Sequence, residues 1–270
     1  MIADHHPERV FPNRKSLLFW KLKQQAALWQ SDMILTVSGH AKQQIVEYCR
    51  VPATRVETTT EGPSDVFMRL PNLEGVTAVL LKYGLRSGEP FLIYVGGISP
   101  HKNLGVLVDA FHQLMADPRL ADHKLVLVGD YKGDVFFSHY AELKADIEQR
   151  GLAARVSFTG FVPDSELVVL YNLARVLVLP SLEEGFGLPA VEAMACGAPV
   201  IASDRGSLPE VVGPAGLFFD PSRPDVLVKL LRDVLSSESI RDRMILAGLE
   251  RSKLFTWELA AQSTAALFER

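Results

Sequence analysis

The sequence is poor in cysteine, has no long apolar run and carries little net charge. Its two cysteines in 270 residues, Cys49 and Cys196, match no metal-binding or redox spacing, so we expect a reducing compartment, the cytoplasm. No segment approaches the roughly 18 apolar residues of a membrane-spanning helix. The first residues lack the basic and apolar parts of a secretory signal. A net charge of −4 argues against a general nucleic-acid partner.

Two common nucleotide-binding patterns are also missing. G-x-G-x-x-G does not follow the relevant predicted strands, which argues against a dinucleotide-dependent oxidoreductase. The P-loop pattern G-x-x-x-x-G-K-[ST] does not occur either. A phosphate-binding site in this chain therefore has to use other loops.

A regular alternation of short apolar runs and helical segments fills most of the chain. With 48% hydrophobic residues, the chain can bury one sizeable core. The strands predicted for this part are residues 91–95, 125–129, 156–159, 176–179, 200–202 and 217–219. Such βαβ units predict an α/β fold, a Rossmann-like parallel sheet with helices on both faces. Ligands bind these sheets at the carboxyl ends of the strands.

The most informative segment follows the strand at 176–179. A glycine-rich turn leads into a helix that has Pro189 in its first turn and that ends near Cys196 and Gly197. The unpaired backbone N–H groups of the turn and the positive end of the helix dipole favour an anion. The residues that we expect to bind this anion are Gly185, Phe186, Gly187 and Leu188.

Two carboxylates frame this turn. Glu184 precedes it, and Glu192 lies about one turn inside the helix. A carboxylate beside an anion site suggests that it meets something else, such as a sugar hydroxyl or a developing positive charge. The alternative is that both are ordinary surface residues, but their occurrence with the glycines, Pro189 and the preceding strand favours function.

A second strand–turn–helix unit lies earlier in the chain. The strand at 91–95 is followed by a turn that starts at Gly96 and by a helix that runs to about residue 115. We assign Lys102, at the end of this turn, to the diphosphate of a bound nucleotide. As a plain surface lysine at a helix start, Lys102 would be mildly unfavourable against the dipole, which favours the binding role.

The segment 184–203 closely resembles the E-x7-E signature of the family 4 retaining glycosyltransferases, which have the two-domain GT-B architecture. The resemblance implies that Glu184 lies near the transferred sugar and that Glu192 hydrogen-bonds the nucleotide ribose. Lys102 matches the Pro-x-Lys-Asn pattern of the family. Gly97, beside the phosphates, stands where many members have arginine, so this chain departs from the family there.

Two further loops belong to the expected nucleotide site. Gly129 ends a predicted strand at the same edge of the sheet, where its backbone can approach the nucleotide. Phe161 and Val162 follow another strand, and the family resemblance implies that their loop meets the base largely through backbone groups.

The resemblance also implies a domain division. Residues 1–67 look like the last part of an N-terminal acceptor-binding domain, a partial second α/β domain, and most of that domain is expected to be absent. Residues 68–270 look like the C-terminal nucleotide-sugar-binding domain. Its last helix, about 256–269, is expected to cross back towards the N-terminal part.

A basic helix is predicted near the beginning of the chain. Leu18, Leu22, Ala26 and Trp29 recur at helical spacing. We interpret this stripe mainly as a face packed on its own domain. The alternative is that residues 14–29 contact an acidic membrane surface, which would place the protein peripherally at the inner face of the membrane.

The predicted function is the transfer of a hexose from a GDP- or UDP-sugar to a hydroxyl of a glycan or lipid-linked acceptor, with retention of configuration. Mannose and glucose are the commonest hexoses in the family. Glu184 and Lys102 are the predicted catalytic residues. No Asp-x-Asp element occurs, so we expect no metal ion and no cofactor. The alternative is a catalytically silent unit that binds nucleotide sugars and needs a missing domain or a partner.

Overall fold

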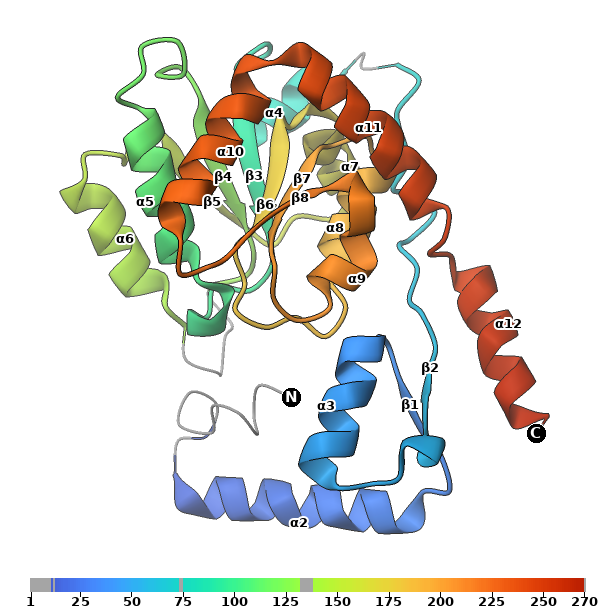
Figure 1. The fold of residues 1–270 in the computed structure, drawn as a ribbon. Coiled ribbons are helices and arrows are strands. Elements are labelled where there is room, and N and C mark those ends of the chain that lie inside the picture. Colours follow the sequence, from blue (N-terminus) through green and yellow to red (C-terminus); the bar gives the residue numbers. More distant parts are fainter. Residues whose placement is uncertain (1–10, 12, 73–74, 132–137, 270) are drawn as a thin grey trace.

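The fold is described here from a computed structural model, which places residues 11, 13–72, 75–131 and 138–269. A six-stranded sheet forms its centre (Figure 1). The strands of this sheet are β3 (Phe91–Val95), β4 (Lys124–Val128), β5 (Val156–Gly160), β6 (Val176–Leu179), β7 (Val200–Ser203) and β8 (Leu217–Phe219). All neighbouring strands are parallel, which confirms the predicted fold class.

Strands β3 and β6 have the bounds that their apolar runs predict, and all four residues of β6 are buried. Strand β4 starts and ends one residue earlier than predicted, so Gly129 lies in the following loop. A strand buried on both faces reads as a continuous apolar run, and for this reason its bounds follow closely from the sequence.

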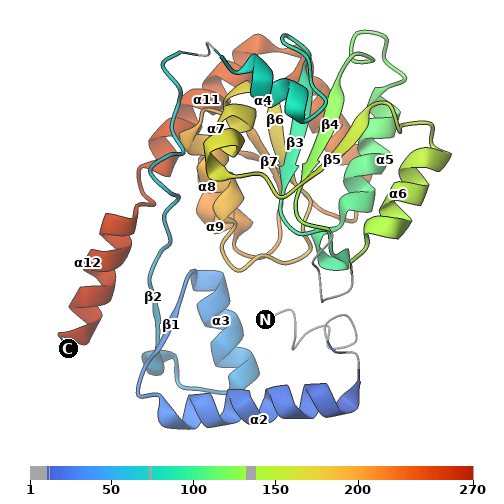
Figure 2. The same cartoon turned by 180° about the vertical axis from the view of Figure 1, so that it is seen from behind.

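Helices cover both faces of the sheet. Figure 1 shows α5, α6 and α10 over one face, and the reverse view in Figure 2 shows α4, α7 and α8 over the other. Their bounds are α4 (Thr77–Lys82), α5 (Leu104–Leu114), α6 (Tyr140–Gln149), α7 (Asp164–Leu173), α8 (Leu188–Ala195) and α10 (Pro224–Ser236). Smaller α9 (Leu208–Val212) follows β7, and long α11 (Glu238–Ser252) packs on α8. The apolar core lies between these helices and the strands.

The strand order, β5-β4-β3-β6-β7-β8, fixes where a ligand is expected. The chain runs outward from β3 through β4 to β5, and then returns to the centre to start β6. Strands β3 and β6 are therefore the neighbours at which the direction of winding reverses. In open sheets of this type, ligands bind in the crevice outside the carboxyl ends of those two strands.

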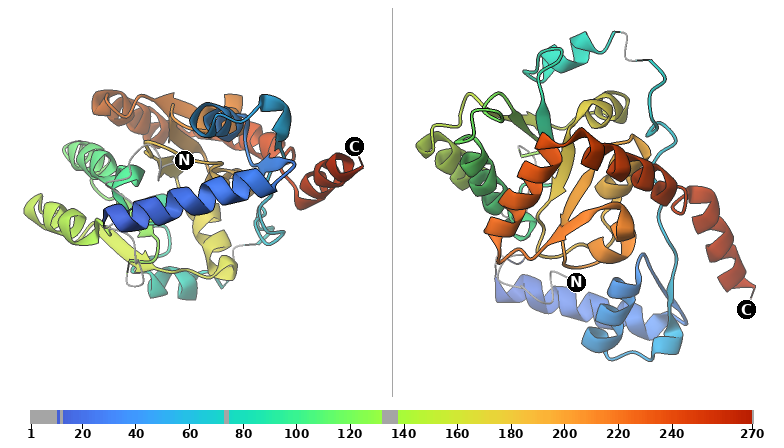
Figure 3. Two further views of the ribbon diagram at one scale, coloured as in Figure 1. Left: turned by 90° about the horizontal axis from the view of Figure 1, so that it is seen from below. Right: turned by 45° about the horizontal axis from the view of Figure 1, so that its top comes forward.

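A small N-terminal unit lies beyond this edge of the sheet. Its parts are α2 (Arg14–Gln30), β1 (Ile34–Thr36), α3 (Gly39–Cys49) and β2 (Val56–Thr58). The two strands are parallel and pair with each other, not with the main sheet. Figure 3 shows this unit from below, with α2 in front. The domain boundary near residue 67 stays a prediction.

Helix α12 (Trp257–Phe268) begins at Thr256, whose side chain accepts a hydrogen bond from the backbone N–H of Leu259 at 3.1 Å. The helix leaves the main body beside the connection that carries β2 (Figure 1). Together with Val37 and Glu61, it lines an open cavity of about 560 Å³.

The predicted packing of the α2 stripe is wrong. Leu18, Leu22, Ala26 and Trp29 are all exposed, Trp29 at 85%. The helix is attached through its last turn, where the Arg55 guanidinium donates to the carbonyl oxygen of Leu28 at 2.8 Å. Helical spacing shows that a face is apolar, but it does not show what covers that face.

Candidate functional site

The functional site is built from the loops that leave β3 and β6. The first loop carries Lys102 and the second carries Glu184, and their side chains meet, with Lys102 Nζ 2.7 Å from Glu184 Oε1. The Ser181 hydroxyl donates to the same oxygen at 2.7 Å. The Lys102 and Glu184 side chains are only 18% and 15% exposed. A cation and a carboxylate therefore lie together, partly shielded from water, where the winding reverses.

Backbone and amide hydrogen bonds hold the two loops together. The backbone N–H of Leu182 donates to the carbonyl oxygen of His101 at 2.8 Å. The Asn103 side-chain amide donates to the carbonyl oxygen of Pro180 at 3.2 Å. Asn103 itself adopts a left-handed conformation (φ 55°) that starts α5. These contacts fix the positions of Lys102 and Glu184 relative to each other.

The turn after Glu184 forms as predicted, but not every residue in it faces a ligand. Gly187 has a left-handed conformation (φ 97°) and precedes α8 directly. Pro189 has no N–H and the N–H of Ala190 donates to the carbonyl oxygen of Gly187 at 2.9 Å, so Leu188 is the residue of the first turn whose N–H has no acceptor within the helix. The Phe186 ring is buried against Phe255, with 5.6 Å between ring centroids. Phe186 can therefore serve the site only through its backbone. Its carbonyl oxygen accepts from the Ser207 hydroxyl at 2.8 Å.

Glu192 is a mostly buried residue of α8, not an exposed helix residue. The Tyr171 hydroxyl, from α7, donates to Glu192 Oε2 at 2.9 Å. Burial raises the pKa of the Glu192 carboxyl to about 7, although the hydrogen bond from Tyr171 opposes this rise. Sequence reasoning missed Tyr171 because it reads as a core residue of another helix.

The N-terminal unit contacts the turn that carries Glu184. The Ser38 hydroxyl donates to the carbonyl oxygen of Gly185 at 2.7 Å, and His40 Nε2 lies 2.9 Å from Glu183 Oε1. The Glu210 carboxylate accepts from the backbone N–H of Gly39 at 2.9 Å and of His40 at 3.1 Å. Glu210 thus caps the start of α3.

The family follows from a comparison with known proteins. The family model described as "Glycosyl transferases group 1" matches residues 80–251, which include Lys102, Glu184 and Glu192. The chain belongs to this family.

Two curated relatives of this group 1 glycosyltransferase are mannosyltransferases. The O-antigen chain mannosyltransferase B of Escherichia coli is 35% identical over 266 residues, which are 97% of this chain and 65% of the relative. The serotype-specific mannosyltransferase WbdA of Escherichia coli is 30% identical over 261 residues, which are 96% of this chain and 31% of the relative. The chain thus spans 65% of the length of the first relative and about a third of the second.

Solved structures share the fold of this group 1 glycosyltransferase. Sucrose-phosphate synthase from Thermosynechococcus elongatus matches with a TM-score of 0.79 and 26% identity, over 96% of this chain and 62% of that protein. Anabaena HepE, solved with UDP and glucose, matches with a TM-score of 0.74 and 21% identity, over 88% and 64%. The α/β sheet is therefore that of GT-B glycosyltransferases.

Close backbone contact explains why Gly129 is a glycine in this group 1 glycosyltransferase. A Cβ atom at Gly129 would lie 1.9 Å from the carbonyl oxygen of Gly96. Gly97 lies in the loop that Gly129 touches, but a Cβ atom added at Gly97 itself would have no atom within 4 Å. The two glycines therefore differ in role, since Gly129 lets two loops touch whereas Gly97 leaves open space beside them.

Substitution of these glycines should separate the two roles. We expect Gly129→Ala to lower the free energy of unfolding by about 2–3 kcal/mol, because backbone atoms have to move to admit the methyl group. Gly97→Ala should change it by less than about 0.5 kcal/mol. Urea unfolding measures both. Equal losses for the two variants would contradict this assignment.

The loop after β5 places its two predicted nucleotide-binding residues, Phe161 and Val162, in different environments. Val162 is buried, so only its backbone can meet a ligand. Phe161 is 75% exposed and lines an open cavity of about 390 Å³ with Tyr83 and Pro163. The structure therefore places Phe161 at the surface, in the loop directly after β5, which is an edge strand of the sheet. Among the residues that the structure describes, no group of three histidine, cysteine, aspartate or glutamate side chains is arranged to hold a metal ion.

The raised pKa of Glu192 makes stability depend on pH. The folded carboxyl ionises near pH 7 and its ordinary pKa is 4.5, so between these values the folded chain binds more protons than the unfolded chain. Stability should therefore fall as the pH rises from about 5 to 7. Glu192→Gln removes the buried charge, and we expect it to raise the free energy of unfolding at pH 8 by about 1–3 kcal/mol, with little change at pH 5.

Denaturant unfolding at both pH values measures this effect, and Tyr171→Phe is the matched control. Its hydroxyl stabilises the charged carboxylate, so its loss should lower stability more at pH 8 than at pH 5. The two variants are thus expected to have opposite signs at pH 8. A Glu192→Gln effect that is the same at both pH values would show that this carboxyl ionises normally.

Proposed function

We propose that this chain transfers a hexose from a nucleotide-diphosphate sugar to an acceptor hydroxyl, with retention of configuration and without a metal ion or other cofactor. Mannose is the favoured hexose because the two Escherichia coli relatives, which match 97% and 96% of this chain, are named mannosyltransferases. The proposed donor is a GDP- or UDP-sugar, and the proposed acceptor is a glycan or a lipid-linked glycan.

The observation that carries this proposal is the contact between Lys102 and Glu184. A lysine ammonium group has three donors, so Lys102 can hold Glu184 with one and still offer two to phosphate oxygens. Its partner Glu184 lies four residues before the start of α8, whose dipole favours the same anion. The protein thus brings positive charge to the place where the diphosphate leaves.

The carboxylates complete the proposed reaction. When the bond between the sugar and the diphosphate breaks, positive charge develops on the sugar, and the negative charge of Glu184 stabilises it. Glu192, further along α8, is proposed to accept hydrogen bonds from the ribose hydroxyls. Tyr171 is a positioning residue, because it holds one oxygen of Glu192 and leaves the other for the ribose.

A second candidate is a nucleotide-sugar-binding unit that does not catalyse transfer alone. The observation that favours it is that the chain aligns with 65% of the length of the first relative. Both candidates share the donor site, and they differ in whether this chain can also bind and use an acceptor.

A panel of nucleotide sugars tests the proposal. We expect GDP- or UDP-linked hexoses to raise the melting temperature, since a ligand that binds only the folded state stabilises it. With a glycan acceptor added, whose hydroxyl takes the sugar, release of nucleoside diphosphate should accompany binding if the chain is the transferase. Binding without release would favour the second candidate, and no stabilisation by any nucleotide sugar would contradict both.

Helix α2 is proposed to contact an anionic membrane at the inner, cytoplasmic face. Its exposed Leu18 and Leu22 are flanked by Lys15, Lys21 and Lys23. None of the described helices is long and apolar enough to cross a bilayer. We expect co-sedimentation with phosphatidylglycerol vesicles that the double variant Leu18→Ser/Leu22→Ser loses. Equal sedimentation of both proteins, or none, would contradict the proposal.

A further inference from the structure

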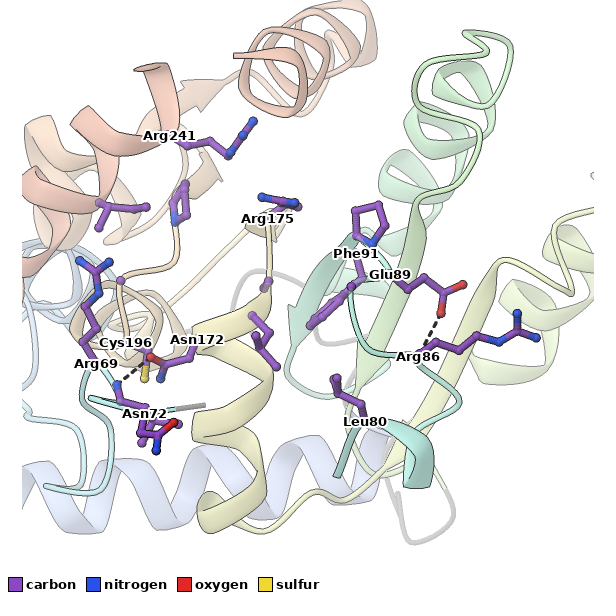
Figure 4. Close-up of a pocket in the computed structure, with 18 of the residues that line it drawn as sticks. Arg69, Asn72, Leu80, Arg86, Glu89, Phe91, Asn172, Arg175, Cys196 and Arg241 are labelled. Carbon is purple, nitrogen blue, oxygen red and sulfur yellow. Dashed lines mark hydrogen bonds between the residues drawn. The ribbon is translucent and has the colours of Figure 1, made fainter. Parts of the chain in front are cut away.

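A cavity lies at the edge of the main sheet where the strands begin, opposite the edge that carries Lys102 and Glu184. It encloses about 550 Å³ and is lined by Pro90, Arg175 and Pro199, which directly precede β3, β6 and β7 (Figure 4). Lys102 and Glu184 follow β3 and β6 at the other edge. Strands of four to five residues, at about 3.3 Å per residue, separate the two places by more than about 13 Å. The cavity is therefore not part of the proposed donor site.

Arginine dominates the charged residues of this cavity. Its lining includes Arg69, Arg86, Arg175 and Arg241, and Glu89 is the one carboxylate among the lining residues that the structure describes. Glu89 lies 3.8 Å from Lys124 and also accepts from the backbone N–H of Arg86 at 3.1 Å, so it has other partners. Within the described ranges, none of the four guanidinium groups forms an ion pair with a carboxylate.

The arginines line different sides of the cavity. Figure 4 shows Arg175 and Arg241 on one side, Arg69 on another side, and Arg86 extending away. Arg241 Nη1 donates to the carbonyl oxygens of Val234 and Leu235 at 2.7 and 2.9 Å, which holds this guanidinium in place. Burial, and then the nearby charge of Arg175, lower the pKa of Arg241. Like charges are thus held close together.

Structural roles account for only part of this charge. The Arg241 guanidinium donates to carbonyl oxygens in the last turn of α10. Helices α7 and α8 end at the cavity, where their last carbonyl groups carry partial negative charge. Two helix ends supply about −1 in total, whereas Arg69, Arg175 and Arg241 supply three positive charges. The Arg69 side chain also needs the space at Gly197, since its Cδ lies 3.8 Å from where a Cβ would be. A net positive cavity remains.

We propose that this cavity binds a small phosphate-bearing anion, at a site separate from the donor site. Guanidinium groups match phosphate oxygens with paired hydrogen bonds, and an anion between Arg175 and Arg241 would relieve their repulsion. The volume suits a small molecule with two or three phosphate groups. The proposal does not depend on which sugar or acceptor the chain uses.

Calorimetric titration with inorganic tripolyphosphate tests the proposal. The probe could also enter the donor site, so the titration uses the Lys102→Ala variant, in which that site is disabled. We expect one molecule to bind per chain, with an affinity that falls as salt rises. In this background, Arg69→Gln/Arg175→Gln should weaken binding at least about 30-fold. Both side chains are exposed and neither makes a described hydrogen bond, so the fold should remain intact, which a melting curve checks.

Arg232→Gln is the matched control, because Arg232 is exposed and does not line the cavity. It should leave tripolyphosphate affinity within about twofold of the Lys102→Ala parent. Unchanged affinity in Arg69→Gln/Arg175→Gln would overturn the proposal. Binding to the wild-type chain that Lys102→Ala abolishes would also overturn it, but would leave the proposed function standing, since the anion would then occupy the donor site.

Discussion

Replacing Glu184 by glutamine is expected to lower the rate of sugar transfer at least about 100-fold, with donor affinity within about threefold of wild type. The amide oxygen can still accept from Lys102 and Ser181, so the loop keeps its shape. A neutral amide cannot stabilise the positive charge that develops on the sugar. Single-turnover assays with a radiolabelled nucleotide sugar measure the rate, in whatever context the chain is active.

The adjacent Glu183 provides the control. Its carboxylate contacts His40 and not Lys102, so Glu183→Gln should retain transfer within a few-fold of wild type. If Glu184→Gln turned over at the wild-type rate, the role assigned to this carboxylate would be wrong.

In the Arg69→Gln/Arg175→Gln background, which removes the second proposed anion site, Lys102→Ala is expected to weaken nucleoside diphosphate binding at least about 30-fold and to abolish the thermal shift that these ligands cause. The variant loses the ammonium group, and it also leaves Glu184 as a partly buried carboxylate without its cation. That carboxylate would then repel the phosphates. Calorimetry with nucleoside diphosphates measures the affinity.

A double variant tests this explanation. Lys102→Ala/Glu184→Gln removes the unpaired carboxylate, so it should bind nucleoside diphosphates better than Lys102→Ala alone, and the pair should not be additive. Lys124→Ala, at the opposite edge of the sheet, is the control and should bind as wild type does. A thermal shift that survives Lys102→Ala in the Arg69→Gln/Arg175→Gln background would mean that the phosphates bind elsewhere.

The sequence predicts well the parts of the fold that are determined by residues close together in the chain. Strand β6 is a short apolar run ended by Pro180, and α8 starts where Gly187 and Pro189 place its first turn. These features depend on neighbours in the chain, so they can be read without knowledge of the tertiary structure. The same signals placed Lys102 and Glu184 at one edge of the sheet.

Contacts between distant parts of the chain could not be predicted in this way. The Tyr171 hydroxyl meets Glu192 only because α7 and α8 pack side by side, and its spacing gives no sign of this. Glu210 caps α3 across about 170 residues of sequence. The apolar stripe of α2 predicts packing against the rest of the domain, but the stripe is exposed. The prediction fails because helical periodicity does not identify what covers an apolar face.

The most direct test of the account is a crystal structure of the chain with a bound nucleoside diphosphate. We predict that a phosphate oxygen lies about 3 Å from Lys102 Nζ, that the diphosphate faces the start of α8, and that the ribose contacts Glu192. A nucleotide bound at another place, with the Lys102–Glu184 pair untouched, would contradict the account.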